Sequence, residues 1–187
     1  MMDQKELARK VKLIIMDVDG TLSDGRFFML PNGDTVKSFD VKDGTGIQFA
    51  RLAGLTTAII TGKKSEIVRR RAEELQVHEY YENVYNKTIP FFELLKKYDL
   101  QKDEVAYIGD DIGDAEVMGM VGFAAAVGDA HPLIKRISHY IAKRYGGRGA
   151  VREVIDFILD NQEKWQEIFT ALKGTEGWEE IFRELNA

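Results

Sequence analysis

The feature that most limits how this chain can fold is a short apolar run, residues 13–18, that ends beside a pair of acids. Asp17 lies inside the run, Asp19 follows two residues later, and Gly20 comes directly after. A short apolar run closed by glycine is typical of a buried parallel strand. Such strands present reactive groups at their carboxyl ends, where open α/β sheets bind ligands. The alternative, on these residues alone, is a plain strand followed by an Asp-Gly turn.

The rest of the chain alternates between strand-like and helix-like segments. Further buried-type or β-prone runs occur at residues 55–60, 77–85, 105–108, 122–128 and 139–142. Helical apolar spacing lies between them, at residues 43–53, 63–75, 87–95 and around 117–118, and again at 150–160. Strands and helices alternating through short loops predict an α/β fold. We expect a Rossmann-like doubly wound parallel sheet with helices on both faces.

Residues 24–41 depart from this alternation. Two β-prone runs flank Asn32-Gly33, and Asn-Gly between such runs is a strong hairpin signal. This small hairpin could form a wall of the crevice beside Asp17, or it could simply be an extra pair of strands. The sequence alone favours neither role.

Length and charge exclude several classes of protein. The chain has 187 residues, a net charge of −5 and no cysteine. Disulfide frameworks, thiolate catalysis and cysteine zinc sites are therefore excluded, and the negative charge argues against general nucleic-acid binding. No apolar run approaches the ~20 residues of a membrane span, and the first 12 residues lack a signal-peptide core. We expect a cytoplasmic protein that acts on a small molecule.

Three strand ends carry polar residues next to glycine, and a lysine begins an intervening helix. The residues concerned are Asp17 and Asp19, Thr61 and Gly62, Asp110, Asp111 and Asp114, and Lys87. In a parallel sheet these strand ends gather at one edge, where clustered carboxylates would repel one another unless a cation or protonation relieved them. Oxygen ligands without cysteine or a histidine cluster favour a hard cation, so Mg²⁺ is the expected cofactor.

Such a site suits phosphoryl transfer to a carboxylate. Mg²⁺ and Lys87 would cancel the repulsion between an anionic phosphate and an anionic nucleophile. Asp17 fits the nucleophile that forms an aspartyl-phosphate, and Asp19 fits the acid that protonates the leaving alcohol and later activates water. Thr61 would hold a phosphate oxygen. We expect Thr61 and Lys87 to bind the substrate, and the family resemblance described next implies the same for Gly62 and Lys63.

These four clusters, in this order, resemble the motifs of the haloacid dehalogenase-like phosphatases over residues 10–160. The resemblance implies a metal held by the carboxylates of Asp17 and Asp110 and by the backbone carbonyl of Asp19. It makes Asp114 an outer orienting residue and leaves open whether Asp111 touches the metal. It also implies a phosphatase domain at residues 1–160, and the amphipathic pattern of residues 161–187 predicts a C-terminal helical extension. About 40 residues separate Asp19 from Thr61, which implies a branch without a cap domain.

Finer features resemble the 3-deoxy-D-manno-octulosonate 8-phosphate phosphatases, among them the hairpin and the segment Gly146-Gly147-Arg148-Gly149. That resemblance implies lipopolysaccharide biosynthesis and a homotetramer in which neighbouring subunits complete each other's active sites. One position differs, because those enzymes usually have arginine where Lys63 stands, and only arginine offers a planar fork to a carboxylate. Phosphatases of nine-carbon nonulosonate 9-phosphates vary at this position. The substrate could therefore be an eight-carbon or a nine-carbon sugar acid phosphate.

Plainer interpretations remain for several of these residues. Asp110 could cap the following helix, Lys63 could be a surface charge, and Arg148 could be a solvated loop residue rather than one that reaches a neighbouring site. The whole chain could also be a receiver-like domain that keeps the acidic crevice without turnover. A pair of similar segments, residues 165–169 and 178–182, predicts amphipathic helices that pack on this subunit or on a neighbour.

Overall fold

A computed structural model describes residues 3–32 and 35–172 of the chain. The strands in chain order are β1 (Leu13–Met16), β2 (Phe28–Met29), β3 (Thr35–Val36), β4 (Thr56–Ile60), β5 (Glu79–Tyr81), β6 (Val105–Gly109), β7 (Phe123–Ala126) and β8 (Tyr140–Ile141). The helices are α1 (Gln4–Arg9), α2 (Val41–Leu52), α3 (Glu66–Glu74), α4 (Thr88–Tyr98), α5 (Ala115–Met118), α6 (Pro132–Ile137), α7 (Ala150–Asn161) and α8 (Trp165–Leu172). Two short 3-10 turns, η1 (Lys102–Glu104) and η2 (Ile112–Asp114), flank β6.

Six of the strands form one sheet in the order β5-β4-β1-β6-β7-β8, and every neighbouring pair in it is parallel. The central strand β1 pairs with β4 on one side and β6 on the other, with Met16 opposite Ile59 and Ile108. All four residues of β1 are buried, as its apolar run predicts. The order of the strands reverses between β1 and β6. Ligands of doubly wound sheets bind at such a switch point.

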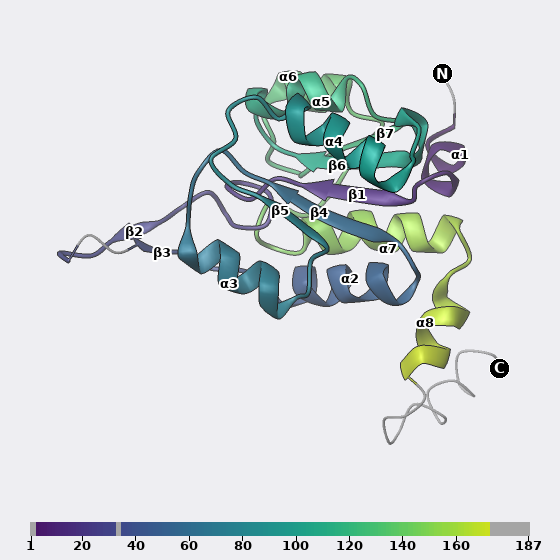
Figure 1. The fold of residues 1–187 in the computed structure, drawn as a ribbon, viewed down its shortest axis with the longest axis horizontal. Coiled ribbons are helices and arrows are strands. Elements are labelled where there is room, and N and C mark those ends of the chain that lie inside the picture. Colours follow the sequence, from purple (N-terminus) through teal and green to yellow (C-terminus); the bar gives the residue numbers. More distant parts are fainter. Residues whose placement is uncertain (1–2, 33–34, 173–187) are drawn as a thin grey trace.

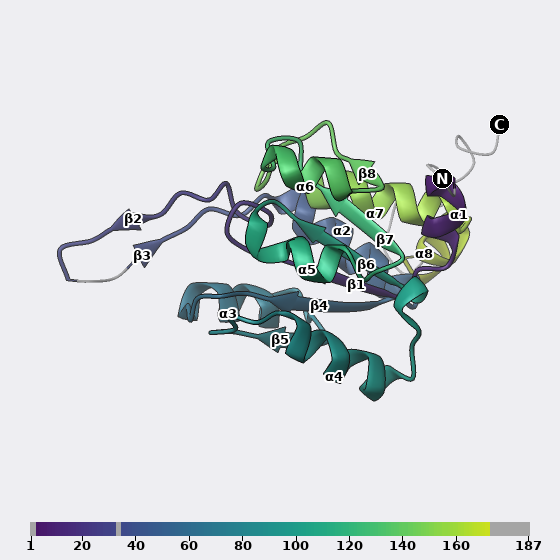
Figure 2. The same ribbon diagram turned by 90° about the horizontal axis from the view of Figure 1, so that it is seen from above.

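Helices cover both faces of the sheet, which confirms the predicted Rossmann-like α/β architecture (Figure 1). Helices α2, α3 and α7 lie on one face, and α4, α5 and α6 lie on the other, as the view from above also shows (Figure 2). The largest fully buried side chains, Tyr107, Phe91 and Phe123, come from β6, α4 and β7. Within the described ranges, no helix has both the length and the apolar character needed to cross a lipid bilayer.

Most predicted elements form, although their ends differ from the sequence pattern. Helix α3 begins at Glu66 instead of Lys63, because Ser65 has extended backbone angles and occupies the N-cap position. Asp40 caps α2 with its side chain, which accepts a hydrogen bond from the Lys42 N–H. The strand region predicted at 77–85 shortens to β5. Lys63 is thereby left in the loop that follows β4, where its side chain can approach the strand ends.

The predicted hairpin forms from the antiparallel pair β2 and β3, and it projects away from the body of the molecule (Figures 1 and 2). The tip of its turn, residues 33–34, lies outside the described residues. Among the described residues between Asp19 and Thr61, the only elements are this hairpin, α2 and the sheet strand β4. This part of the chain therefore has no cap domain, as expected.

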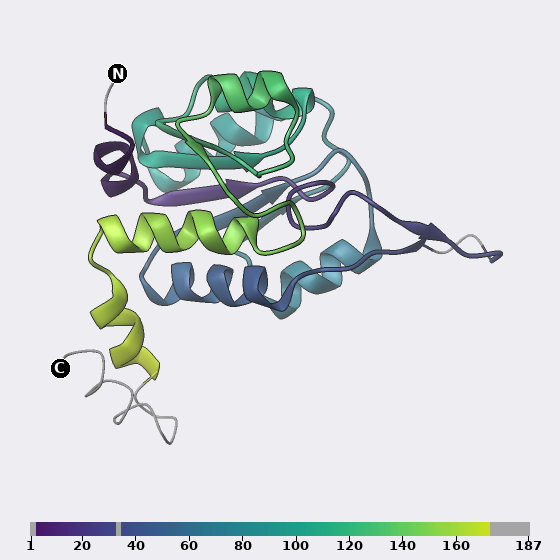
Figure 3. The same cartoon turned by 180° about the vertical axis from the view of Figure 1, so that it is seen from behind.

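Helix α7 packs along α2, and α8 follows it at the far end of the sheet (Figure 3). Trp165 of α8 meets Phe49 of α2 edge to face, with ring centroids 5.8 Å apart. The first of the two similar segments, residues 165–169, is therefore helical and packs on its own subunit. The second, residues 178–182, lies outside the described residues, so the predicted boundary at residue 160 stays a prediction.

Candidate active site

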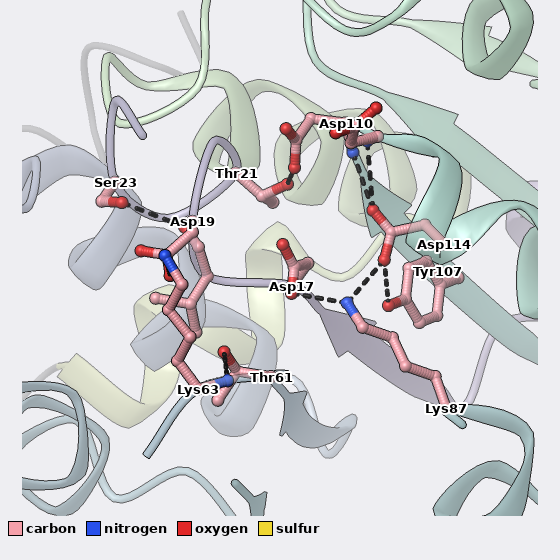
Figure 4. A network of polar contacts seen from close by, with 12 residues as sticks. Asp17, Asp19, Thr21, Ser23, Thr61, Lys63, Lys87, Tyr107, Asp110 and Asp114 are labelled. Carbon is pink, nitrogen blue, oxygen red and sulfur yellow. Dashed lines mark hydrogen bonds and ion pairs between the residues drawn. The ribbon is translucent and has the colours of Figure 1, made fainter. Parts of the chain in front are cut away.

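The predicted site residues meet at the carboxyl ends of β1, β4 and β6. Asp17 follows β1 directly, and Asp110 follows β6 directly, so the pairing of these strands places the two acids side by side. Figure 4 shows Asp17, Lys87 and Asp114 pointing toward one another. One carboxylate oxygen from each of Asp17, Asp110 and Asp114 lies within 4.8 Å of the others. This acidic trio forms the centre of the candidate site.

Lys87 supplies the positive charge inside the trio. It occupies the N-cap position of α4, and its Nζ donates hydrogen bonds of 2.6 Å to Asp17 Oδ1 and 2.7 Å to Asp114 Oδ1. Tyr107 donates a further bond of 2.6 Å to that same oxygen of Asp114. The second oxygen of Asp114 accepts from the backbone N–H of Asp110 and, more weakly, from that of Asp111. Asp114 is thus occupied by donors on both oxygens, as expected of an orienting residue.

The protonation equilibria reflect the excess of carboxylates over ammonium groups. Burial raises the pKa of Asp17 to about 6, repulsion from Asp114 adds to the shift, and Lys87 opposes it. Burial also raises the pKa of Asp110 to about 7, with repulsion from Asp17 as the next cause. Burial alone would lower the pKa of Lys87, but Asp17 and Asp114 raise it above its ordinary value. A bound cation would relieve this repulsion and favour the carboxylate forms.

The turn after Asp19 brings its backbone against Asp110. Gly20 has a φ of +98°, and a Cβ at this position would lie 2.1 Å from Asp110 Oδ2. Glycine is therefore required both by the backbone angle and by the close approach of Asp110. Thr21 donates its hydroxyl to Asp110 Oδ1 at 2.9 Å. The motif that follows β1 thus orients the acid that follows β6.

Asp19 lies at the edge of the trio and faces two lysines. Lys37, which follows β3 in the hairpin, is 2.5 Å from Asp19 Oδ1, and Lys63 is 3.8 Å from Asp19 Oδ2. Lys63 also lies over the ring of Phe27, with its Nζ 4.9 Å from the centroid. The structure therefore brings Lys63 to the edge of the site, and its role in substrate binding stays a prediction.

Thr61 and Gly62 follow β4, on the other side of β1. The side chain of Thr61 is buried, and its hydroxyl is 3.5 Å from the N–H of Lys63. Gly62 is open enough that an added Cβ would make only an ordinary contact, with the carbonyl of Val84. Thr61 therefore lies at the carboxyl end of β4, on the same side of the sheet as Asp17 at the end of β1 (Figure 4).

Asp111 has a different place from its neighbours. Its carboxylate is exposed and accepts a hydrogen bond from the Ile112 N–H, so that Asp111, and not Asp110, caps the short turn η2. Its oxygens are not part of the acidic trio. Asp111 touches the site through its backbone N–H, and the capping role considered for Asp110 falls to Asp111.

The glycine-rich segment, residues 146–149, packs against the loop that follows β1. The Gly147 N–H donates to the Thr21 carbonyl at 2.9 Å, and a Cβ on Gly146 would lie 1.7 Å from the carbonyl oxygen of Gly20. The neighbouring Arg148 lies 3.6 Å from Asp24 of the same chain, with most of its side chain exposed. The segment Gly146–Gly149 therefore packs on the backbone of the Asp17–Thr21 motif.

Two contacting residues escaped the sequence analysis. Tyr107 has the sequence pattern of an ordinary core residue of β6, and its hydroxyl reaches Asp114 only through the fold. Residues three apart in a strand point to opposite faces, so strand alternation does not connect Tyr107 with Asp110. Lys37 belongs to a hairpin of unknown placement, so no spacing in the sequence connects it with Asp19. Both contacts need the tertiary structure.

Comparisons of this chain with known proteins all point to the same family. Residues 81–155 match the family described as haloacid dehalogenase-like hydrolase. The chain is 45% identical over 160 residues to the 3-deoxy-D-manno-octulosonate 8-phosphate phosphatase of Escherichia coli (strain K12), covering 86% of this chain and 85% of that protein.

Solved structures agree with this result. The crystal structure of 3-deoxy-D-manno-octulosonate 8-phosphate phosphatase from Yersinia pestis superposes with a TM-score of 0.86 and 42% identity, covering 88% of this chain and 89% of that one. The phosphatase of the same name from Moraxella catarrhalis was solved in complex with a magnesium ion, a phosphate ion and a KDO molecule. It matches with a TM-score of 0.87 and 36% identity over 92% of this chain and 99% of that chain.

Proposed function

This chain belongs to the haloacid dehalogenase-like hydrolases, within the group of 3-deoxy-D-manno-octulosonate 8-phosphate phosphatases, and we propose that it hydrolyses this eight-carbon sugar acid phosphate with Mg²⁺. The products would be the free sugar acid (KDO) and phosphate. The observation that carries the proposal is the contact of Lys87 with Asp17 inside a trio of carboxylates at the switch point of the sheet. A receiver-like domain without turnover would have no need of Asp19 beside that trio.

The first step transfers the phosphoryl group to the protein. An oxygen of Asp17 attacks phosphorus as the bond from phosphorus to the sugar oxygen breaks. The electron pair of that bond stays on the sugar oxygen, which takes a proton from Asp19. Lys87 offsets the charge repulsion between Asp17 and the phosphate, and the Thr61 hydroxyl donates to a phosphate oxygen. The result is an aspartyl-phosphate and a free alcohol.

The second step regenerates the carboxylate of Asp17. Asp19, now ionised, takes a proton from a water molecule whose oxygen attacks phosphorus. The bond between Asp17 and phosphorus breaks, and inorganic phosphate leaves. Asp19 is protonated again and ready for another cycle, so one residue serves as acid and then as base.

The donors at the site fit a magnesium ion. The Oδ2 atoms of Asp17 and Asp110 are the oxygens that Lys87 and Thr21 leave open, whereas both oxygens of Asp114 accept hydrogen bonds. Asp17 and Asp110, together with the backbone carbonyl of Asp19, would hold the ion, and Asp114 would orient Lys87 and the loop. When bound, Mg²⁺ supplies positive charge that stabilises the phosphate oxygens during transfer.

The hairpin supports an assembly with shared active sites, which we propose to be a homotetramer. Phe28 and Met29 in β2 are 71% and 76% exposed, and Phe27, Leu30 and Val36 are also exposed. An apolar patch of this kind, on an arm that projects from the body, is typical of a surface that another protein covers. A neighbouring subunit at this arm would cover the open side of the crevice beside Asp19 and Lys63.

A panel of phosphate esters tests the proposed activity. The purified chain with Mg²⁺ is expected to hydrolyse 3-deoxy-D-manno-octulosonate 8-phosphate with a higher kcat/KM than nonulosonate 9-phosphates, hexose 6-phosphates and p-nitrophenyl phosphate. Asp17→Asn should abolish the activity, whereas Asp99→Asn should not, because Asp99 is exposed and its left-handed backbone also suits asparagine. Preference for the nine-carbon substrates would reassign the enzyme, and equal rates on all esters would contradict a specific sugar-acid phosphatase.

A further inference from the structure

Lys37 is a buried lysine at the base of the otherwise exposed β2–β3 hairpin. Its side chain is 5% exposed, although the preceding residue, Val36, is 43% exposed. Lysines on exposed hairpins normally keep the ammonium in water and lay only the stem on the protein. Here the ammonium turns inward and donates a hydrogen bond of 2.5 Å to Asp19 Oδ1.

The two oxygens of Asp19 therefore have different surroundings. Oδ1 is held by Lys37, whose ammonium is shielded from solvent, whereas Oδ2 faces Lys63, which is 62% exposed and 3.8 Å away. An ammonium is a donor only, so an oxygen that it holds is poorly suited to carry a proton. Oδ2 is the oxygen left to exchange one.

We propose that Lys37 is a positioning residue of the hydrolysis, which fixes Asp19 through Oδ1 and leaves Oδ2 as the atom that gives and takes the proton. The proposal rests on the phosphatase function proposed above. Lys37 acts through Asp19, in the way that Lys87 acts on Asp17 from the other side of the strand ends. The hairpin then contributes to the chemistry of its own subunit, in addition to any contact that it makes with a neighbour.

The nature of the leaving group separates this role from a structural one. An alkyl phosphate such as 3-deoxy-D-manno-octulosonate 8-phosphate needs a proton on its leaving oxygen, whereas p-nitrophenolate leaves without one. Lys37→Met should therefore lower kcat/KM for the sugar phosphate by about 10²-fold, the lower end of the general-acid contribution, and change kcat/KM for p-nitrophenyl phosphate by less than about threefold. The comparison uses kcat/KM because this constant covers only the steps up to release of the alcohol, whereas hydrolysis of the aspartyl-phosphate is common to both substrates. Its KM for the sugar phosphate should change little, because Lys37 holds Asp19 and not the substrate.

Two further variants complete the experiment. Lys64→Met removes an exposed lysine of the loop after β4 and should leave both rates unchanged. Lys37→Arg keeps a cation near Asp19 and should recover part of the lost activity toward the sugar phosphate. Melting temperatures of Lys37→Met and Lys64→Met should be equal within error.

Several results would overturn the proposal. Equal losses of kcat/KM on both substrates, or no loss on either, would show that Lys37 does not act on proton transfer to the leaving group. A melting temperature of Lys37→Met clearly below that of Lys64→Met would show that Lys37 supports the fold instead. These failures differ from a failure of the proposed function, in which the unaltered chain with Mg²⁺ would release no phosphate from any of the esters.

Discussion

Lys87 donates a hydrogen bond of 2.6 Å to Asp17, across 70 residues of sequence, and both side chains are close to fully buried. A buried lysine is tolerated here because Asp17 and Asp114 hold its charge from two sides. The same arrangement offsets part of the repulsion between the proposed nucleophile and Asp114. The pair joins β1 to the start of α4 and thereby joins two of the sequence motifs.

Replacing Lys87 by methionine should remove both its chemical and its electrostatic contributions. We expect kcat/KM to fall by about 10²–10³-fold, as it does when a preorganised electrostatic group is lost. The free energy of unfolding should fall by about 3–5 kcal/mol at neutral pH, because buried carboxylates lose their counterion. Steady-state kinetics and urea denaturation measure the two effects. The matched control is Lys96→Met on the exposed side of α4, and retention of a tenth or more of kcat/KM in Lys87→Met would count against the assigned role.

Tyr107→Phe should lower the affinity of the site for Mg²⁺ without abolishing binding. The substitution deletes the hydroxyl that donates to Asp114 Oδ1 at 2.6 Å, inside the core. We expect a loss of about 1–3 kcal/mol in the free energy of unfolding and a lower affinity for Mg²⁺, because Asp114 orients the loop that carries Asp110. Tyr98→Phe removes a hydroxyl bound to Glu79, away from the trio, and should leave Mg²⁺ affinity unchanged. Isothermal titration would contradict the prediction if both variants bound Mg²⁺ alike.

Without metal, the stability of the folded chain should fall as pH rises, whereas the stabilisation that Mg²⁺ adds should grow. The pKa values of about 6 for Asp17 and about 7 for Asp110 lie above the ordinary value for aspartate, so the folded state binds protons more tightly than the unfolded state. Without metal, this part of the stability is fully present below about pH 4 and is lost as pH rises through 6 and 7. Asp43, with a pKa of about 6 caused by burial, contributes in the same direction.

Mg²⁺ binds the carboxylate forms, so its effect should grow over the same range. The rise in melting temperature caused by Mg²⁺ should be small at pH 5 and large at pH 8, as measured by thermal denaturation with and without the ion. Asp110→Asn should abolish most of the rise. An equal rise at both pH values would show that the ion binds elsewhere.

Gly146→Ala should displace the loop that carries Asp17 and Asp19, although residue 146 is far from this loop in sequence. The added Cβ would lie 1.7 Å from the carbonyl oxygen of Gly20, a backbone atom that cannot move without displacing the Asp17–Thr21 motif. We expect a loss of about 1–3 kcal/mol in the free energy of unfolding, typical of overpacking, together with reduced kcat. Gly113→Ala is the control, because a Cβ there would meet nothing within 4 Å. Equal urea midpoints and equal kcat values for the two variants would show that the contact between residues 146 and 20 contributes neither to stability nor to catalysis.

The exposed arm gives a prediction about assembly. The double variant Phe28→Ser, Met29→Ser should lower the mass measured by light scattering from that of a tetramer toward that of one chain, and activity on the sugar phosphate should fall with it. Leu133→Ser, a change at an exposed apolar residue of α6, should affect neither. A fully active monomer of the unaltered chain would contradict the shared-site arrangement.

The sequence predicts those parts of the site that depend on local pattern. Asp17 and Asp110 each stand at the end of an apolar run that is typical of a buried strand, and parallel pairing then places them together. The pattern does not predict Lys37 or the contact of Gly146 with Gly20, because both depend on how a hairpin and a distant loop fold back over the sheet. The pattern also leaves open whether Asp111 touches the metal, since either of two adjacent acids can cap a helix.

The packing of residues 146 and 147 on residues 20 and 21 also orders events during synthesis. All four motifs, from Asp17 to Asp114, are synthesised before residues 146 and 147, whose backbone supports Thr21. A nascent chain of some 140 residues would contain every proposed catalytic residue and still lack the partner of the nucleophile's own loop. Competence to turn over substrate would therefore be acquired late, when translation has passed the glycine-rich segment and α7 can close against α2.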